Sequence, residues 1–306
     1  MIDTLYIVVP CFNEEEVLPE TSKRLKDKIM NLINSNKISS ESKILFVNDG
    51  SSDNTWNIIK NLHKQDNLFL GISLSRNCGH QNALLAGLFT ASDYADITIS
   101  LDADLQDDIN VIDKFIEEYY KGNDIVYGVR NSRKTDTFFK RTTALFFYKF
   151  MNFLGVNIVY NHADYRLLSK KCINHLKDFN EVNLFLRGLI PLIGFNSSTV
   201  EYERKERFAG KSKYPLKKMI SFAIDGITSF STKPLSLISL LGLIVCFIGI
   251  ILLISNIFYD NLLTVSSIWI VGGLNLLSLG IVGIYVGKIY GETKNRPKYI
   301  ISEKLI

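Results

Sequence analysis

The sequence predicts an α/β fold with a mainly parallel, doubly wound sheet, followed by two helices that span a membrane. Through residues 1–130, short apolar runs of strand length alternate with segments whose apolar residues recur at helical spacing. This alternation is typical of a parallel sheet with helices on both faces. Beyond residue 233, two long uncharged windows replace the alternation. A length of 306 residues and a hydrophobic content of 47% agree with two modules, one of them in a membrane.

The expected elements of the first module follow one another closely. Strands are expected at 5–9, 43–47, 68–74, 96–101 and 124–129, and helices at 14–33, after 53, at 83–91 and at 111–120. Small polar and acidic residues from Asn48 to Asp53 suit the start of a helix. Ligands of such sheets bind at the carboxyl ends of the strands, where Pro10, Asn48-Asp49 and Asp102 fall.

Two carboxylates stand one residue apart, at Asp102 and Asp104, directly after the fourth apolar run. Because side chains at positions i and i+2 of a strand point the same way, we expect both to converge on one cation. Gln106 is placed to add a neutral oxygen. Such oxygen ligands suit Mg²⁺ or Mn²⁺, which bridge phosphates and keep several waters. The alternative is a solvated acidic turn, which is the commoner meaning of an isolated Asp-x-Asp.

Composition excludes several classes of function. A net charge of +4, without a basic tract interleaved with aromatics, argues against a nucleic-acid partner. The four cysteines are scattered, which fits a reducing compartment and argues against structural zinc. Neither a dinucleotide fingerprint nor a P-loop occurs. The N-terminus has no signal-peptide pattern, so we expect about the first 200 residues to stay in the cytosol.

The C-terminal part predicts a membrane hairpin over 233–288. No charged residue occurs between Lys233 and Asp260 or between Asp260 and Lys288, and each window exceeds the roughly 20 residues that a spanning helix needs. Lysines and arginines flank the hairpin but are absent from its turn, so the positive-inside rule places both flanks in the cytosol. We therefore expect a multi-pass protein of the plasma membrane with a cytosolic tail at 289–306. A buried globular hairpin is the alternative.

Two further stretches, at about 138–154 and at 215–232, combine helical apolar spacing with lysine and arginine. A basic amphipathic helix beside a membrane span often lies in the headgroup plane. We expect the second stretch to be a juxtamembrane helix of this kind. For the first, an interfacial helix and an ordinary core helix are about equally supported.

Five motifs stand in order along the chain: Val9-Pro10-Cys11-Phe12-Asn13-Glu14-Glu15, Val47-Asn48-Asp49-Gly50-Ser51, Leu101-Asp102-Ala103-Asp104-Leu105-Gln106, Ala163-Asp164-Tyr165-Arg166-Leu167-Leu168 and Arg207-Phe208-Ala209-Gly210-Lys211-Ser212-Lys213-Tyr214. Together they resemble the family 2 glycosyltransferases of the GT-A fold. The closer resemblance is to the polyisoprenyl-phosphate branch, which includes bactoprenol glucosyltransferases and dolichol-phosphate mannose synthases. The resemblance covers nearly the whole chain and implies a GT-A glycosyltransferase domain over 1–214.

The resemblance also implies roles for single residues. Pro10, Phe12 and Glu14 would border the nucleotide, and Asn48 and Asp49 would contact the base, although Asn48 stands where an aspartate is commoner. The metal and the diphosphate would be handled by Asp102, Ala103, Asp104 and Gln106. Arg130 would lie near the acceptor, and Arg207 and Lys213 would belong to a loop that closes over the phosphates.

Asp164 occupies the place usually assigned to the catalytic base in the family that the chain resembles. A lipid phosphate has a second pKa near 6 by analogy with phosphoesters, so at neutral pH it is mostly dianionic and needs little proton removal. We therefore expect Asp164, beside Arg166, to orient the acceptor or the loop as much as it acts as a base. Arg166 pairing with Asp164 for structure alone is the alternative. His80 and His162 are interpreted as hydrogen-bonded loop residues and Lys211 as solvated.

The predicted function is inverting transfer of a sugar from a nucleotide sugar to undecaprenyl or another polyprenyl phosphate at the cytosolic membrane face, for modification of cell-envelope glycans. UDP-glucose is the first expected donor, followed by UDP-GlcNAc and GDP-mannose. Mg²⁺ or Mn²⁺ is the expected cofactor, and the resemblance implies a homo-oligomer, a tetramer. A processive polysaccharide synthase is one alternative, but its Gln-x-x-Arg-Trp motif is absent. A non-catalytic, membrane-anchored nucleotide-binding scaffold is the other, and the intact motifs argue against it.

Overall fold

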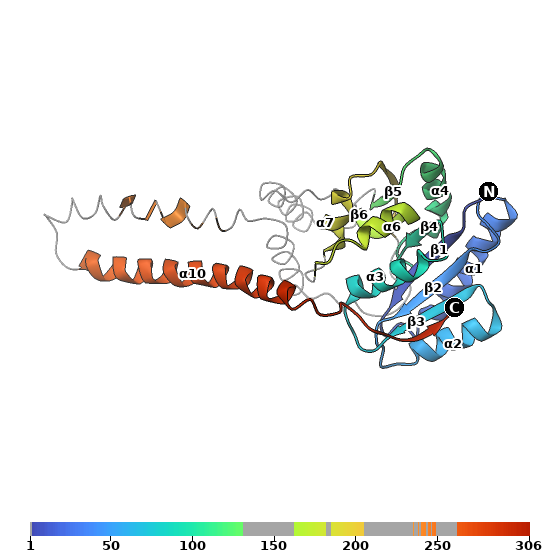
Figure 1. The fold of residues 1–306 in the computed structure, drawn as a ribbon, viewed down its shortest axis with the longest axis horizontal. Coiled ribbons are helices and arrows are strands. Elements are labelled where there is room, and N and C mark those ends of the chain that lie inside the picture. The colour runs from blue at the N-terminus through green and yellow to red at the C-terminus, as the bar shows by residue number, and fades with distance from the viewer. Residues whose placement is uncertain are drawn as a thin grey trace.

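The computed structural model describes residues 2–130, 162–181, 185–204, scattered positions between 235 and 248, and 262–306. An α/β body holds the N-terminal residues, and one long helix, α10, projects from it (Figure 1). The expected helices at 138–154 and 215–232 lie outside the described residues, as does the loop at 207–214.

One eight-stranded sheet forms the centre of the body, in the order β7-β5-β6-β4-β1-β2-β3-β8. Its strands are β1 (Leu5–Cys11), β2 (Lys43–Asn48), β3 (Phe69–Leu74), β4 (Ile97–Ser100), β5 (Ile125–Arg130), β6 (His162–Ser169), β7 (Ser197–Tyr202) and β8 (Ile301–Leu305). Strands β4, β1, β2 and β3 are parallel, and β5 is parallel to β7. β6 is antiparallel to β4 and β5, and β8 is antiparallel to β3.

The mainly parallel sheet is confirmed, and the five expected strands are present with small shifts of their ends. The sequence pattern did not predict β6, β7 or β8. Charged side chains at Asp164 and Arg166 interrupt the apolar pattern of β6, and polar residues dominate β7 and β8. Residues 301–305, expected as part of a tail, instead extend the sheet at its β3 edge.

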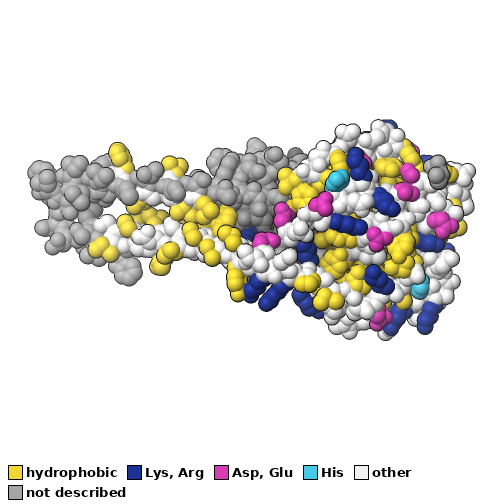
Figure 2. Space-filling model, in the orientation of Figure 1, with side chains coloured by type: hydrophobic (Ala, Val, Ile, Leu, Met, Phe, Trp, Pro, Cys, Tyr) yellow, Lys and Arg dark blue, Asp and Glu magenta, His cyan; other side chains and the backbone are white. Residues whose placement is uncertain are grey.

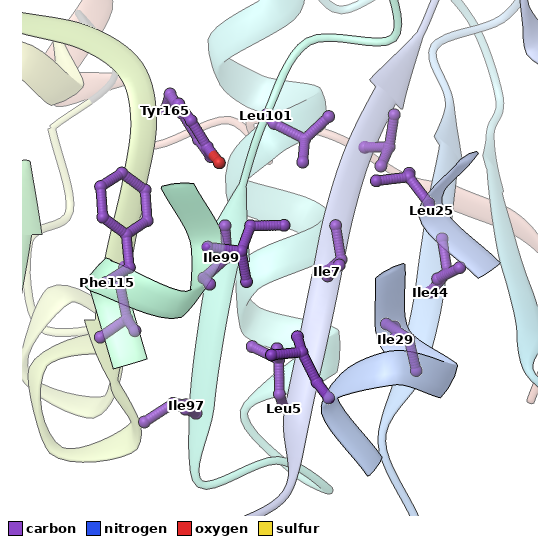
Figure 3. Close-up of a cluster of buried hydrophobic side chains, with 14 of the residues drawn as sticks. Leu5, Ile7, Leu25, Ile29, Ile44, Ile97, Ile99, Leu101, Phe115 and Tyr165 are labelled. Carbon is purple, nitrogen blue, oxygen red and sulfur yellow. The ribbon is translucent and has the colours of Figure 1, made fainter. Parts of the chain in front are cut away.

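Helices cover both faces of the sheet. One face packs against α1 (Leu18–Asn34), α2 (Thr55–Gln65), the short 3₁₀ helix η1 (Ile109–Val111) and α4 (Ile112–Tyr120), and the other against α3 (His80–Ala91), α6 (Lys170–Leu176) and α7 (Leu186–Leu192). Side chains alternate along each strand, so Ile7 of β1 enters the first core and Val8 the second. Figure 3 shows the first core, where Ile7, Ile44 and Ile99 lie side by side in the sheet. Burial on both faces explains why the central strands are continuous apolar runs.

The helix α10 (Leu262–Thr293) coincides with the second expected membrane span. Within it, Ile270–Thr293 is long and apolar enough to cross a membrane, and none of its most apolar stretch is buried in protein. Figure 2 shows hydrophobic side chains exposed along this helix. It is the one such helix among the described residues. Most of the first expected span lies outside them, with isolated helical positions between 235 and 248.

Candidate active site

The loops that follow β1 and β2 are tied to each other by hydrogen bonds. The Asn13 amide donates to Ser51 Oγ at 3.0 Å, and the Glu14 amide donates to Thr55 Oγ1 at 2.9 Å. Pro10 is buried at the end of β1, while Phe12 and Glu14 are half-buried in the loop. These residues therefore lie at the carboxyl edge of the sheet, where a nucleotide is expected to bind.

Asn48 and Asp49, expected to contact the base, are both buried and bonded within the protein. Asn48 Nδ2 donates to Ser73 Oγ at 2.9 Å, and the Ser51 amide donates to Asn48 Oδ1 at 3.1 Å. The Asp49 carboxylate accepts from the amides of Cys78 at 2.7 Å and Gly79 at 3.0 Å. Burial raises the pKa of Asp49, and these amides oppose the increase. In this structure both side chains order the loops, and a direct contact with the base remains a prediction.

Gly50 allows the loops after β2 and β3 to approach closely. Its φ is 62°, in the left-handed region that favours glycine. A Cβ atom built there would lie 2.4 Å from the carbonyl carbon of Arg76. The backbone nitrogen of Asn77 would lie 2.5 Å from the same Cβ. Because these obstacles are backbone atoms, the geometry of the Asn-Asp-Gly turn requires a glycine.

The Asp102–Asp104 segment is a loop rather than a strand. β4 ends at Ser100, so strand alternation does not orient these two carboxylates and the reason we gave for their convergence is wrong. Thr21 Oγ1 of α1 donates to the Ala103 carbonyl at 2.7 Å, while the Ala103 side chain is buried in the core. Leu105 has a φ of 57°, a strained conformation for a leucine. Tertiary contacts and this strained turn therefore position the carboxylates.

These side chains fit a divalent cation held together with a substrate. Among the described residues no group of three or more His, Cys, Asp and Glu side chains could hold a metal ion by itself. Mg²⁺ is commonly held by one or two carboxylates together with substrate phosphates and waters, which Asp102 and Asp104 can provide. Partial burial raises the pKa of Asp102, and the charges of Asp164 and Asp104 add to this increase while His80 opposes it. A divalent cation would offset that repulsion.

Gln106 is engaged by Arg204, which donates to its Oε1. The backbone amide of Gln106 donates to Asp104 Oδ1 at 3.1 Å, so Gln106 stabilises the loop that carries Asp104. The role of Gln106 as a metal ligand remains a prediction.

A second set of contacts near this loop involves Asp107. Tyr202 Oη donates to Asp107 at 2.6 Å, and Arg130 Nε donates to Tyr202 Oη at 3.4 Å. Burial raises the pKa of Asp107 to about 6, with the charge of Asp102 contributing.

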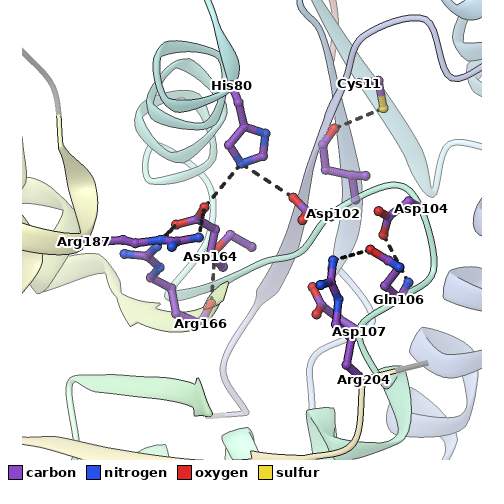
Figure 4. A network of polar contacts seen from close by, with 12 residues as sticks. Cys11, His80, Asp102, Asp104, Gln106, Asp107, Asp164, Arg166, Arg187 and Arg204 are labelled. Atoms are coloured by element: carbon purple, nitrogen blue, oxygen red, sulfur yellow. Dashed lines mark hydrogen bonds and ion pairs between the residues drawn. The ribbon is translucent and has the colours of Figure 1, made fainter. Parts of the chain in front are cut away.

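On the other side of Asp102 lies Asp164, which β6 carries beside β4 (Figure 4). Ser100 Oγ donates to the Asp164 carbonyl at 2.6 Å and fixes its backbone. The Asp164 carboxylate contacts Arg166, Arg187 and His80. His80 Nε2 also lies 3.6 Å from Asp102 Oδ1, so His80 connects the two carboxylates.

Sequence reasoning missed Arg187, and it interpreted His80 as a loop residue, whereas His80 lies in α3 beside two carboxylates. Arg187 is the single charged residue in the apolar α7, a signal of a specific role because charged groups are rarely placed among apolar ones without a partner. His80 begins α3 after a glycine with positive φ, a pattern that marks a helix start but not a site. Arg207 and Lys213 lie outside the described residues, so their roles remain predictions.

A mainly parallel sheet with an Asp-x-Asp loop at the carboxyl end of β4 defines an α/β protein of the GT-A class. Residues 6–177, more than half of the chain, match the family described as Glycosyl transferase family 2. The chain belongs to this family and is a glycosyltransferase.

The chain is also similar, over nearly its whole length, to proteins described as glycosyltransferases. The chain is 53% identical over 306 residues to a Bacillus subtilis protein described as the uncharacterized glycosyltransferase YkoT, covering 97% of this chain and 90% of that protein. It is 40% identical over 307 residues to a Shigella flexneri protein described as an SfII prophage-derived bactoprenol glucosyl transferase, covering 97% of each. It is 39% identical over 305 residues to a prophage bactoprenol glucosyl transferase homolog of Escherichia coli K12, covering 96% of this chain and 97% of that protein.

Proposed function

We propose that this glycosyltransferase moves a sugar, with inversion, from a nucleotide sugar to polyprenyl phosphate at the cytosolic face of the membrane. UDP-glucose is the first donor to test. The observation that carries the proposal is the combination of the carboxylate loop at Asp102–Asp104 with an exposed, membrane-length helix on the same chain. The full-length similarity to bactoprenol glucosyl transferases supports a polyprenyl phosphate acceptor.

The donor half of the site comprises Asp102, Asp104 and the loops after β1 and β2. A divalent cation bound there would neutralise the charge that develops on the leaving diphosphate. Arg204 and Arg130 add positive charge beside the same loop. Preorganised cationic groups of this kind stabilise a leaving group more in the transition state than in the ground state. Arg207 and Lys213 are proposed to close over the phosphates as part of the loop at 207–214.

The position of β8 supports a membrane hairpin. β8 belongs to the same sheet as β1 to β4, so the chain after α10 lies on the same side of the membrane as the site. A chain that leaves one side and returns to it crosses the membrane an even number of times. If α10 crosses once, a second crossing lies between residues 204 and 262, where 234–259 is the uncharged window of sufficient length.

Basic residues at and just after the C-terminal end of α10 support a cytosolic location of the site. Lys288, Lys294, Arg296 and Lys298 follow the uncharged window at 261–287, and Figure 2 shows lysine and arginine side chains gathered where the helix meets the body. Such residues favour the cytosolic side and attract anionic lipid headgroups. A polyprenyl phosphate held in that leaflet would have its phosphate on the same side of the membrane as the site. A role in cell-envelope glycans and a homo-oligomeric state, a tetramer, are part of the same proposal.

The decisive experiment is a donor screen with the full chain in lipid vesicles that contain undecaprenyl phosphate. Radiolabelled UDP-glucose, UDP-GlcNAc and GDP-mannose are each supplied with Mg²⁺ or Mn²⁺. We expect one donor to yield a lipid-extractable, singly glycosylated product that is lost when the acceptor is omitted. Products longer than one sugar would indicate a processive synthase, and no lipid-linked product with any donor would contradict the proposal.

A further inference from the structure

The oxygens of the Asp164 carboxylate contact two arginines and one histidine. Oδ1 accepts from Arg166 Nη2 and from Arg187 Nε, the latter at 3.3 Å. Oδ2 accepts from Arg187 Nη2 at 3.1 Å and lies 3.7 Å from His80 Nε2. Figure 4 shows these side chains converging on Asp164 from β6, α7 and α3. A carboxylate that accepts hydrogen bonds from two guanidinium groups is in an unfavourable setting for accepting a proton.

Arg166 makes ionised Asp164 a requirement of the fold. Its side chain is 0% exposed, and its Nε and Nη1 atoms have no hydrogen-bond acceptor among the described residues. Asp164 is the carboxylate to which it is paired. Protonation of Asp164 would leave a buried guanidinium without a counter-charge, which is strongly destabilising. Burial alone would raise the pKa of Asp164, but the charges of Arg187 and Arg166 outweigh it and hold that pKa well below its usual range.

Arg187 is fixed at the exposed side of this cluster. Its side chain is 31% exposed, whereas that of Asp164 is 18% exposed. The start of α7 is tied to α3, because the Leu186 amide donates to Gln81 Oε1 at 2.8 Å. Gln81 follows His80, so this hydrogen bond positions both Arg187 and His80, the two side chains that reach Asp164 from outside β6. The two-point contact with Asp164 fixes the plane of the Arg187 guanidinium.

Among the described residues, two guanidinium groups gather on the side of Asp102 that faces away from Asp104 and Gln106 (Figure 4). One carboxylate, Asp164, is paired with two guanidinium groups. Arg130 is also close enough for its charge to interact with that of Arg187. The planar guanidinium of arginine presents N–H donors in a fork whose geometry matches a phosphate.

We propose that Arg187 binds the phosphate of the acceptor lipid and that Asp164 is the positioning residue that holds it, rather than a proton acceptor. This inference rests on the proposed function, which supplies a phosphate acceptor. In the transfer, an oxygen of the dianionic phosphate forms a bond to the anomeric carbon. The bond from that carbon to the diphosphate breaks, and its electron pair leaves with the diphosphate. No proton has to be removed from a phosphate above its second pKa, near 6.

The test is a kinetic comparison of Arg187→Gln and Arg187→Lys in the full chain. Both variants keep Asp164 and Arg166, so the buried pair retains its compensation. We expect Arg187→Gln to raise the KM for undecaprenyl phosphate at least tenfold while the donor KM stays within twofold. Arg187→Lys should recover part of the lost acceptor binding, because lysine keeps the positive charge but lacks the planar pair of N–H donors of the guanidinium. Arg24→Gln is the matched control, since the Arg24 side chain is exposed on α1 and forms an ion pair with Glu20 one helical turn away.

The result that overturns this inference is an unchanged acceptor KM in Arg187→Gln. A loss confined to kcat would assign Asp164 a chemical role and Arg187 the role of tuning it, which also overturns the inference. Wild-type transfer to undecaprenyl phosphate is measured first. Its absence would contradict the proposed function, whereas normal wild-type transfer with an unaffected Arg187→Gln variant would contradict only the role of Arg187.

Discussion

At the scale of single residues, Asp104 is the carboxylate most firmly built into the donor half of the site. It is 5% exposed, and its Oδ1 accepts the Gln106 amide, which fixes its orientation. Asp102 is more open and lies beside His80. A buried, oriented carboxylate loses less entropy on binding a cation, so Asp104 is expected to carry most of the metal affinity.

Asp104→Asn should therefore reduce turnover at saturating Mg²⁺ or Mn²⁺ by about 100-fold or more. The amide is nearly isosteric but removes the charge that holds the cation. Initial rates at several metal concentrations measure the effect. Asp93→Asn, at an exposed position paired with Lys177, is the control and should behave as the wild type. Full activity of the wild type in EDTA would contradict the metal requirement.

A second residue-scale prediction concerns stability and pH. Burial would raise the pKa of Asp113, but hydrogen bonds from Lys28 and Lys37 outweigh it and lower that pKa. A group whose pKa is lower in the folded state stabilises the fold above its unfolded pKa, about 3.9 for Asp, and loses this contribution as the pH falls through the folded pKa.

Asp113→Asn should therefore lower the stability at pH 7 by less than about 1 kcal/mol, because the ion pairs are partly exposed. The difference from the wild type should shrink as the pH is lowered below about 4. Thermal unfolding of both proteins across this range is the measurement. A constant difference at all pH values would indicate lost packing instead of lost charge.

At the scale of elements, the loops after β2 and β3 depend on the close approach at Gly50. Gly50→Ala should destabilise the protein by about 1–3 kcal/mol, since it adds strain at positive φ and a clash with backbone. The donor KM should rise as well, because the displaced loop carries Asp49. Gly122→Ala is the matched control: its φ is 96°, but no atom lies within 4 Å of the added carbon. Equal destabilisation of the two variants would show that strain alone matters.

The edge strand β8 contacts two neighbouring elements, β3 and α2. Ser302 Oγ donates to the Ser73 carbonyl at 3.0 Å, and Trp56 Nε1 of α2 donates to Glu303 at 3.1 Å. Ser73 also accepts from Asn48, so β8 lies one strand away from the loop that is expected to contact the nucleotide. The final residues thus connect the membrane helix to the sheet of the site.

At the scale of the whole molecule, the prediction concerns which side of the membrane each segment faces. In a background without other cysteines, Asn261→Cys, in the expected turn, should react with an impermeant maleimide added to intact cells. Lys304→Cys, exposed on β8, should react only after the cells are permeabilised. Labelling of Lys304→Cys in intact cells would overturn the even number of crossings.

The sequence by itself determined the central sheet and the location of the site. The strands from β1 to β5 are apolar runs because helices bury both of their faces, so their pattern is local and visible. The turns at Asn48 and Asp102 follow such runs, which placed them at one edge of the sheet. The uncharged window that forms α10 was equally visible, because length and lack of charge are local properties.

The tertiary structure alone decided what surrounds these residues. Antiparallel insertion of β6 between β4 and β5 brings Asp164 beside Asp102, although more than 60 residues separate them in the chain. Arg187 and His80 reach Asp164 from two other helices, and no periodic pattern marks a single charge whose partner is distant in sequence. The return of β8 to β3 is a pairing across more than 200 residues. Such contacts depend on which segments the folded sheet brings together, a property that no local window of sequence contains.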